Sequence, residues 1–422
     1  TNGKSLQKGL ENCLADIQKG RISTTDESAF QVGNNIAATP GSVIYENSIM
    51  QLIQYQPTTP MVSQRPILMV PPCVNKYYIL DLQRHNSLIR YCLDQGHQVF
   101  CMSWINPGTG QGALSWEDYL RQGVLTAMDI AGDVAGSDKI HTLGWCIGGT
   151  LLATALAVRN NNGKKSDISS ATFITTMLDF SDPGDLGIFL NEIPEEAVAL
   201  SENTGVIPGE FCYAFFSLIK ADQLIWPYLI SNYLKGETPA AFDFLYWNSD
   251  STNLPAGLYM DFIRQFYKQN ALIKPGGLTL CGIPIDLGKI NTPSYFLSTV
   301  DDHIIPWQAT LPNTRLFSGH TEFVLGSSGH VAGVINPPDP TRRNHWINGE
   351  TGSGPAHWLN TATPVDGSWW MHWLDWLKKW DGKKVAAPKN PGNDTYQIIE
   401  PAPGRYVKSR TNLWNPDAAP HE

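Results

Sequence analysis

The sequence has few cysteines and none of the paired spacings typical of metal sites. Seven cysteines are scattered over 422 residues. An odd, dispersed set in a chain of this length argues against a disulfide framework and predicts a reducing, cytoplasmic location. No CxxC, HxxxH or HExxH motif occurs, so the sequence gives no support for a bound metal.

Long apolar runs and an excess of positive charge are also missing. No apolar stretch approaches the roughly 18 residues that a membrane-spanning helix needs, so we expect no membrane span. Lys and Arg number 30 against 39 Asp and Glu, a net charge of −9, and no basic run occurs, which argues against nucleic-acid binding. With 42% apolar and 16% charged residues, the composition is that of a folded globular protein.

What the sequence does contain is an alternation of short apolar runs with longer helical stretches. The runs are bounded by Gly or Pro, a pattern that indicates βαβ units and a mostly parallel sheet. We expect strands at 66–70, 97–104, 139–143 and 171–178, and helices at 78–93, 116–134 and 150–158.

The alternation stops for about a hundred residues in the middle of the chain. This part is rich in aromatic residues and poor in strand signals, so we interpret 181–290 as an inserted, mainly helical cap. Strand signals resume at 294–300 and 322–325. The predicted organisation is a first core part at 1–180, with an N-terminal segment at 1–60, then the cap at 181–290 and a second core part at 291–422.

Four tryptophans near the C-terminus, Trp369, Trp373, Trp376 and Trp380, are spaced like one face of an amphipathic helix. Such a face either packs into the core or touches an apolar partner. Large aromatics at helical spacing are more often core residues, so we expect this helix to pack inside the molecule.

The pattern that carries chemistry is Gly-Trp-Cys-Ile-Gly at 144–148, between an expected strand and an expected helix. It matches the nucleophile elbow, a strained strand-to-helix turn, with Cys146 in the nucleophile position. The flanking glycines let strand and helix backbones approach. The side chain then lies at the positive end of a helix, which favours a thiolate.

An elbow requires an acid and a histidine later in the chain, each after a strand. Asp301 and Asp302 follow one expected strand, and His303 comes next; His330 follows the next strand. The order is therefore correct. Spacing alone leaves Asp301 and Asp302 as alternatives for the acid, and His303 and His330 as alternatives for the base.

Backbone N–H groups would stabilise the oxyanion of such a reaction. In this arrangement one donor is the residue after the nucleophile, Ile147, and the second comes from the loop after an early strand, where we favour Val74. Its neighbour Cys73 could be a second nucleophile, but a buried loop thiol is the simpler interpretation.

Together these residues resemble the polyhydroxyalkanoate synthases, most closely the single-subunit class I enzymes. The matching motifs run nearly from end to end of the chain. They are TDESAF (25–30), VPPCVNKYYILDL (70–82), GWCIGG (144–149), NYLKG (232–236), WNSDSTN (247–253), DHIIPW (302–307), GHVAGVINP (329–337) and EPAPGRYV (400–407).

The resemblance implies an α/β-hydrolase fold with a cap, and polymerisation of (R)-3-hydroxyacyl-CoA into a polyester with release of CoA. Short acyl units such as 3-hydroxybutyryl are expected. It makes Cys146 the acyl-carrying nucleophile, His330 its base and Asp302 the third member of the triad. It also implies a homodimer that works in the cytoplasm at the polyester granule surface, without a cofactor, because CoA is a leaving group.

The start of the chain differs from the class I pattern. The N-terminus, Thr1 to Lys4, is polar, with no signal-peptide core and no initiator methionine, so we expect upstream sequence to have been removed. Class I synthases carry an additional N-terminal region. Its absence is expected to affect granule targeting, dimer stability and full activity, but not the chemistry.

Two rival functions use the same residues differently. A Cys-dependent thioesterase or ester hydrolase would use the same triad with water as the acceptor, and spacing does not separate it from a polymerase. A non-catalytic granule-surface protein on a degenerate fold is the second rival. The presence of Cys146, Asp302 and His330 together argues against it.

Overall fold

Short apolar runs of the sequence form the middle of one large sheet. In the computed structural model, which describes residues 3–161, 167–189, 205–339 and 342–410, eleven strands join in the order β15-β14-β13-β12-β7-β6-β4-β5-β2-β1-β17. The six from β13 to β5 are parallel, and the outer strands pair antiparallel. The strands are β1 (Gly41–Glu46), β2 (Met50–Tyr55), β4 (Ile67–Val70), β5 (Val99–Trp104), β6 (Ile140–Trp145), β7 (Ile168–Ile174), β12 (Ser294–Thr299), β13 (Thr321–Gly326), β14 (Asn344–Ile347), β15 (Thr363–Asp366) and β17 (Glu400–Pro401).

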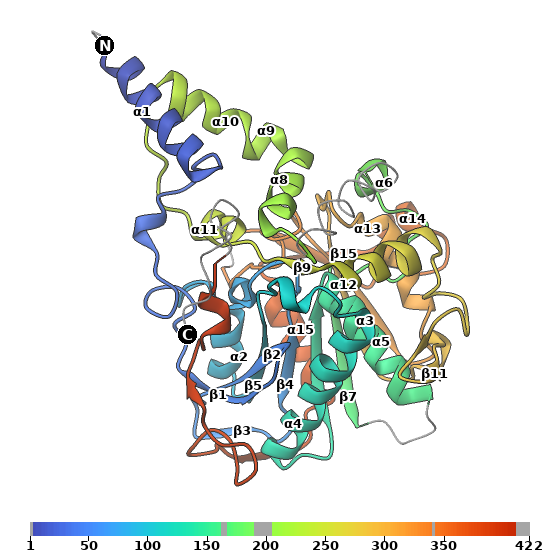
Figure 1. Ribbon diagram of the computed structural model, residues 1–422. Coiled ribbons are helices and arrows are strands. Elements are labelled where there is room, and N and C mark those ends of the chain that lie inside the picture. Colours follow the sequence, from blue (N-terminus) through green and yellow to red (C-terminus); the bar gives the residue numbers. More distant parts are fainter. Residues whose placement is uncertain (1–2, 162–166, 190–204, 340–341, 411–422) are drawn as a thin grey trace.

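Each face of this sheet packs on its own hydrophobic core. Side chains alternate along a strand, so in β4 Leu68 enters one core and Met69 the other. Helices cover both faces (Figure 1). They include α2 (Leu88–Asp94), α3 (Trp116–Asp118), η4 (Tyr119–Leu125), α4 (Thr126–Ala135), α5 (Ile147–Asn161), α13 (Trp307–Thr310), η8 (Leu311–Arg315), α14 (Pro355–Thr361) and α15 (Trp369–Lys378).

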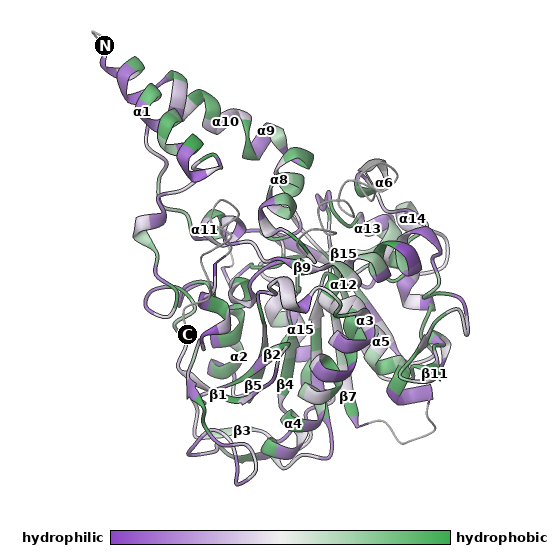
Figure 2. Ribbon diagram, viewed as in Figure 1, coloured by the Kyte–Doolittle hydropathy of each residue, from purple (hydrophilic) through white to green (hydrophobic). Residues whose placement is uncertain are grey.

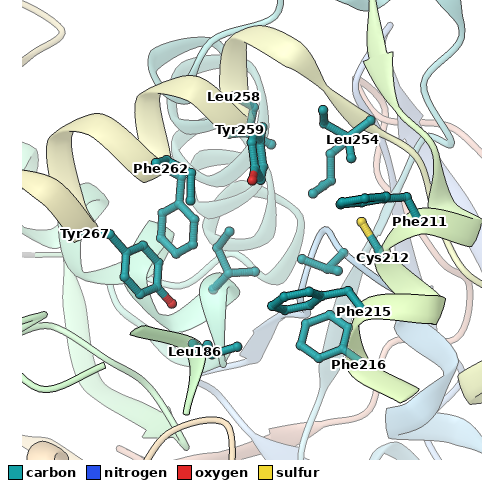
Figure 3. A pocket seen from close by; sticks show the side chains of 14 residues that line it. Leu186, Phe211, Cys212, Phe215, Phe216, Leu254, Leu258, Tyr259, Phe262 and Tyr267 are labelled. Carbon is teal, nitrogen blue, oxygen red and sulfur yellow. The ribbon is translucent and has the colours of Figure 1, made fainter. Parts of the chain in front are cut away.

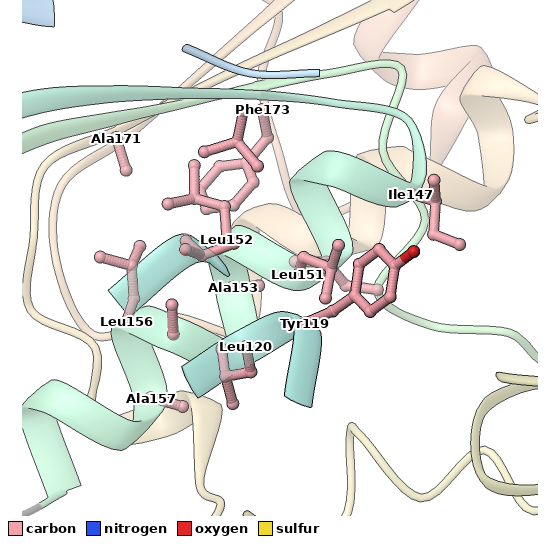
Figure 4. Close-up of a cluster of buried hydrophobic side chains, with 14 of the residues drawn as sticks. Tyr119, Leu120, Ile147, Leu151, Leu152, Ala153, Leu156, Ala157, Ala171 and Phe173 are labelled. Atoms are coloured by element: carbon pink, nitrogen blue, oxygen red, sulfur yellow. The ribbon is translucent and has the colours of Figure 1, made fainter. Parts of the chain in front are cut away.

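Helix α5, which begins directly after β6, lies deep in the first core. Its residues from Ile147 to Val158 are all buried. Figure 4 shows Leu151 and Leu152 of this helix among side chains of η4 and of the sheet, such as Tyr119 and Phe173. An element buried on all sides is held firmly, so the start of α5 is a rigid support for the residue before it.

The tryptophan-rich helix α15 packs against the second core. Trp369, Trp370, Trp373 and Trp376 are at most 2% exposed. Trp373 also donates from Nε1 to Thr172 Oγ1 of β7, at 2.8 Å. The prediction that this helix packs inside the molecule is confirmed.

The prediction of one continuous helix at 78–93 is wrong, because the helix is interrupted in the middle of this range. The chain forms a 3₁₀ helix, η2 (Tyr77–Asp81), and only then α2. The buried carboxylate of Asp81 accepts hydrogen bonds from Ser87 Oγ at 2.6 Å and from Thr39 Oγ1 at 2.5 Å. Ser87 in turn caps α2 by accepting from the N–H of Arg90, so a tertiary carboxylate contact divides the helix.

Between β7 and β12 no described residue joins the large sheet, and the regular secondary structure of this part is mainly helical. The segment 190–204 of the predicted cap lies outside the described residues, and the boundaries at 180 and 290 stay a prediction. The elements are α6 (Leu186–Phe189), β8 (Val206–Ile207), α8 (Gly209–Ile219), α9 (Ala221–Leu224), α10 (Trp226–Tyr228), η5 (Leu229–Leu234), α11 (Asp243–Ser249), β9 (Leu254–Pro255), α12 (Ala256–Asp261), η6 (Phe262–Lys268), β10 (Thr279–Leu280), β11 (Ile283–Pro284) and η7 (Leu287–Lys289).

Part of this region extends away from the body as an arm. Helix α1 (Lys4–Lys19) lies beside η5, and both project past the sheet with α9 and α10 (Figure 1). The contact is close at Gly9, where a Cβ atom would lie 1.9 Å from the carbonyl oxygen of Tyr233. The other short elements are η1 (Glu27–Ala29), β3 (Met61–Ser63), η3 (Thr109–Gln111), β16 (Lys384–Ala386) and η9 (Tyr406–Lys408).

Candidate active site

Cys146 occupies the turn between β6 and α5. Its φ angle is +54°, a left-handed conformation that a residue with a side chain adopts only under constraint. Its carbonyl oxygen accepts the N–H groups of Gly149 and Thr150, so the thiol stands at the N-terminus of α5. The geometry is that of the predicted elbow, and the positive end of the helix favours negative charge on the sulfur.

The two elbow glycines are required by close backbone contacts. A Cβ atom on Gly144 would lie 2.6 Å from Cα of Gly149. On Gly148 it would lie 2.4 Å from the carbonyl oxygen of Val70, at the end of the neighbouring strand β4. Only glycine therefore allows the helix to start this close to the sheet.

Asp302 and His330 form a buried pair at the ends of β12 and β13. Nδ1 of His330 lies 2.7 Å from Oδ2 of Asp302, and both residues are 7% exposed. The other carboxylate oxygen, Oδ1, accepts the N–H groups of Ile304 and Ile305 at 2.9 and 2.8 Å. These donors orient the carboxylate toward the imidazole.

His330 reaches back across the sheet to the elbow. Its ring centroid lies 6.5 Å from that of Trp145, the residue before Cys146. Burial by itself lowers the pKa of His330, but Asp302 and then a hydrogen bond and charge interaction with Cys146 outweigh it and raise that pKa to about 10. The carboxylate of Asp302 therefore favours the protonated form of His330.

The alternative residues have different surroundings. Asp301 is exposed, and its N–H donates to the carbonyl oxygen of Ser328. His303 has its pKa lowered to about 4, mainly by burial and next by the charge of His330. The structure thus brings Asp302, and not Asp301, to His330, and leaves His303 as a neutral neighbour.

The loop after β4 lies beside the elbow. Val70 pairs with Gly144, so the ends of β4 and β6 are level and the loop at 71–74 faces the start of α5. Val74 and Ile147 both line the same cavity. Cys73 is fully buried, and burial raises the pKa of its thiol, which disfavours a nucleophilic role and agrees with a buried loop thiol.

Next to the elbow, and lined in part by Ile147, the residue after Cys146, lies an apolar cavity of about 120 Å³. Its described lining comes from the elbow, the loop after β4, and the cap elements α8, α12 and η6, and Figure 3 shows aromatic rings on several of its sides. The residues are Val74, Ile147, Leu186, Ile207, Phe211, Cys212, Phe215, Phe216, Leu254, Leu258, Tyr259, Phe262, Ile263 and Tyr267. An acyl chain fits such a lining better than a polar substrate does.

The sequence pattern did not single out the cap residues of this lining. Phe211 and Phe215 are spaced four apart, and Tyr259, Ile263 and Tyr267 repeat at four, so helical periodicity is a usable signal. It does not tell which helix faces Cys146, because that depends on how the cap packs on the sheet.

Neither a metal cluster nor a membrane helix is found in the ranges that the structure describes. There, no three His, Cys, Asp or Glu side chains gather in a way that could hold a metal ion. In the same ranges, no helix has the length and apolar character required to cross a bilayer.

Comparison with known proteins agrees with this fold. The family described as "alpha/beta hydrolase fold" matches residues 66–337, which contain the elbow and the Asp302–His330 pair. The fold and the site therefore define an α/β hydrolase. A second family, described as the "Poly-beta-hydroxybutyrate polymerase (PhaC) N-terminus", matches residues 1–92.

Curated relatives give the narrower family. The chain is 46% identical over 416 residues to the poly(3-hydroxyalkanoate) polymerase subunit PhaC of Cupriavidus necator, which covers 97% of this chain and 70% of that protein. It is 41% identical over 418 residues to the corresponding subunit of Rhizobium etli, covering 97% of this chain and 65% of that one. It is 40% identical over 417 residues to the corresponding subunit of Rhizobium meliloti, covering 97% of this chain and 67% of that one. The chain belongs to the poly(3-hydroxyalkanoate) polymerase family and spans about two thirds of the length of these relatives.

Proposed function

We propose that this protein polymerises (R)-3-hydroxyacyl-CoA into a polyester and releases CoA, with Cys146 carrying the acyl chain. The observation that carries the proposal is the position of Cys146, at a strained elbow, paired with a buried His330–Asp302 couple and covered by an apolar cavity. Membership of the polymerase family supports the substrate class. The reaction needs no cofactor, since CoA is part of the substrate.

In the first step the sulfur of Cys146 attacks the thioester carbonyl of the substrate. His330 holds the thiol proton and passes it to the departing CoA sulfur, while Asp302 keeps the imidazole oriented. The N–H groups of Ile147 and Val74 stabilise the oxyanion. One thioester replaces another, so the acyl group stays activated.

In the second step the 3-hydroxyl of the next substrate attacks the acyl group on Cys146. His330 accepts the hydroxyl proton, an ester bond forms, and the C–S bond to Cys146 breaks. The lengthened chain is then a CoA thioester, which acylates Cys146 again and releases CoA. Each cycle adds one unit and frees one CoA.

The cavity favours chain growth over hydrolysis. A thioesterase must admit water to the acyl-enzyme, whereas aromatic side chains surround this site. Excluding water gives the hydroxyl of the next substrate time to react. A thioesterase would use the same triad, so the structure of the site does not separate the two activities. Identification of the product, polyester or free hydroxy acid, does separate them.

The direct test is incubation with (R)-3-hydroxybutyryl-CoA, following free CoA and product size, with Cys146→Ala beside the wild type. We expect CoA release with high-mass polyester, and a loss of both by a factor of roughly 10³ or more in the variant. Release of CoA with free 3-hydroxybutyrate alone would identify a thioesterase. Cys73→Ala is the matched control, because it removes a neighbouring thiol that is buried.

The exposed apolar surface of the arm is suited to contact with the polyester product. On α1, Leu6, Leu10, Leu14 and Ile17 are 58–69% exposed and lie along one face, as their spacing requires. Apolar residues follow along η5, and Figure 2 shows hydrophobic residues on both helices of the arm. The arm continues from α8, which lines the cavity, so apolar surface leads outward from the site. We assign this surface to the apolar polymer.

A homodimer and a cytoplasmic position at the granule surface are part of the same proposal. They rest on the family resemblance. Mass photometry of the purified protein, and fluorescence microscopy of a tagged copy in polyester-accumulating cells, test them separately. A preference for short acyl units is tested by comparing 3-hydroxybutyryl-CoA with a longer homologue.

A further inference from the structure

The cavity beside Cys146 is apolar apart from a few groups. Among the described residues that line it, Tyr259 and Tyr267 bring the only side-chain oxygens, and Cys212 adds a thiol. In an apolar site, a small number of polar groups fixes the orientation of the ligand. The two phenols are therefore the groups that can recognise a polar atom on an acyl chain.

Tyr267 is held in one place by its neighbours. Its ring meets Phe180 and Phe262 edge to face, with centroids 4.8 and 5.1 Å away. Figure 3 shows the ring entering from the side of the cavity with its hydroxyl end turned inward. A donor fixed in this way loses little freedom when it binds a ligand.

The two phenols face different neighbours. Burial raises the pKa of Tyr267, with a smaller contribution from the charge of Cys146. Burial raises the pKa of Tyr259 to about 12, with a further contribution from Cys212. Both phenols are protonated near neutral pH and can donate a hydrogen bond.

We propose that the phenol of Tyr267 binds the 3-hydroxyl of the acyl group at Cys146 and selects hydroxylated acyl units. The inference rests on the proposed function. A saturated acyl group fits the cavity through apolar contacts alone. A 3-hydroxyl brings a polar atom into the same space, where an unpaired hydroxyl is unfavourable. Tyr267, held by Phe180 and Phe262 with its hydroxyl turned into the cavity, provides that partner and so acts on specificity.

The experiment compares Tyr267→Phe with Tyr259→Phe, a matched control that removes a phenol oxygen from the same cavity. Single-turnover CoA release and acyl-enzyme mass are measured with (R)-3-hydroxybutyryl-CoA and with butyryl-CoA, which lacks the hydroxyl. For Tyr267→Phe we expect the acylation efficiency to fall roughly tenfold or more with the hydroxylated thioester and by less than about twofold with butyryl-CoA. Tyr259→Phe should change both substrates by the same factor.

Four results overturn the inference. An equal loss on both thioesters assigns Tyr267 a structural role, and unfolding temperatures of the variants reveal such a role independently. If Tyr267→Phe leaves the preference for (R)-3-hydroxybutyryl-CoA over butyryl-CoA unchanged, the contact between Tyr267 and the 3-hydroxyl is excluded. A selective loss in Tyr259→Phe transfers the role to the other phenol. Wild-type protein that is acylated by neither thioester contradicts the proposed function itself, and the inference with it.

Discussion

Nδ1 of His330 lies 2.7 Å from Oδ2 of Asp302, although the two residues come from the ends of different strands. The same carboxylate accepts two backbone N–H groups on its other oxygen, which hold it in one orientation. An ionised partner on Nδ1 leaves Nε2 of the imidazole for the thiol of Cys146. The pair thus couples the charge of Asp302 to the reactivity of the sulfur.

Replacing the carboxylate tests this coupling. Asp302→Asn removes the charge but keeps the size of the side chain, so His330 loses the main interaction that raises its pKa. We expect polymerisation to fall roughly 10³- to 10⁴-fold, the scale seen when the acid of a triad is neutralised. Initial rates of CoA release measure it, and a variant within tenfold of wild type would contradict the role of Asp302.

The same pair predicts a pH dependence of stability. The pKa of His330 is raised to about 10 in the folded protein, against about 6.5 in the unfolded chain. Its contribution to the free energy of unfolding is therefore complete below about pH 6.5 and is lost as the pH rises toward 10. Urea unfolding of wild type and Asp302→Asn from pH 6 to 10 should show a stability difference that shrinks as the pH increases. A difference that grows over this range would rule out the raised pKa.

Neighbouring histidines offer a matched comparison. His330→Gln removes the base and should abolish polymer formation, while His303→Gln should keep activity within about threefold of wild type. The reason is that burial lowers the pKa of His303 to about 4, which leaves it neutral, whereas His330 is the histidine that pairs with the carboxylate of Asp302. Polymer yield and CoA release are measured for both variants. Equal losses of activity would mean that His303 also takes part in the reaction.

The elbow glycine can be tested through stability. Gly148→Ala would place a Cβ atom 2.4 Å from the carbonyl oxygen of Val70, and backbone at the end of a central strand yields little. We expect a loss of about 1–3 kcal/mol in the free energy of unfolding. Gly110→Ala is the control, since nothing lies within 4 Å of the added atom. Thermal unfolding of both variants measures the effect; equal midpoints would contradict the close contact.

The apolar face of the arm is tested by binding to polyester. Leu10→Ser with Leu14→Ser removes two side chains that are 58% and 61% exposed, and should weaken binding to poly(3-hydroxybutyrate) particles roughly tenfold. Release of CoA from a soluble substrate should be unchanged. Met371→Ser, at 56% exposure on α15, is the control outside the arm. Unchanged particle binding would contradict the assignment, and a halved mass in solution would make the face an interface between copies of the chain.

Much of the fold follows from local pattern. The parallel strands β4 to β7, β12 and β13 correspond to apolar runs bounded by Gly or Pro, and their expected positions agree with the structure to a few residues. The antiparallel strands β1 and β2 were not predicted. They belong to the segment at 1–60, where no alternation with helices marks them, and they form because β5 offers them an edge.

The choice between adjacent candidates depended on the direction of side chains. Asp301 and Asp302 are equivalent by spacing, yet Asp302 points inward to His330 and Asp301 is exposed. The lining of the cavity is a second case, because Tyr267 comes to line it together with Val74 and Ile147 only after the cap has packed on the sheet.

By itself, the sequence determined the elbow around Cys146, because a strained turn between a strand and a helix needs its glycines within a few residues. It also determined the order of nucleophile, acid and histidine. The tertiary structure decided which carboxylate reaches His330, how far the pKa of His330 rises, and which phenols line the cavity next to the elbow. These properties arise from distance and burial between residues far apart in the chain, and neither quantity is encoded in a local pattern.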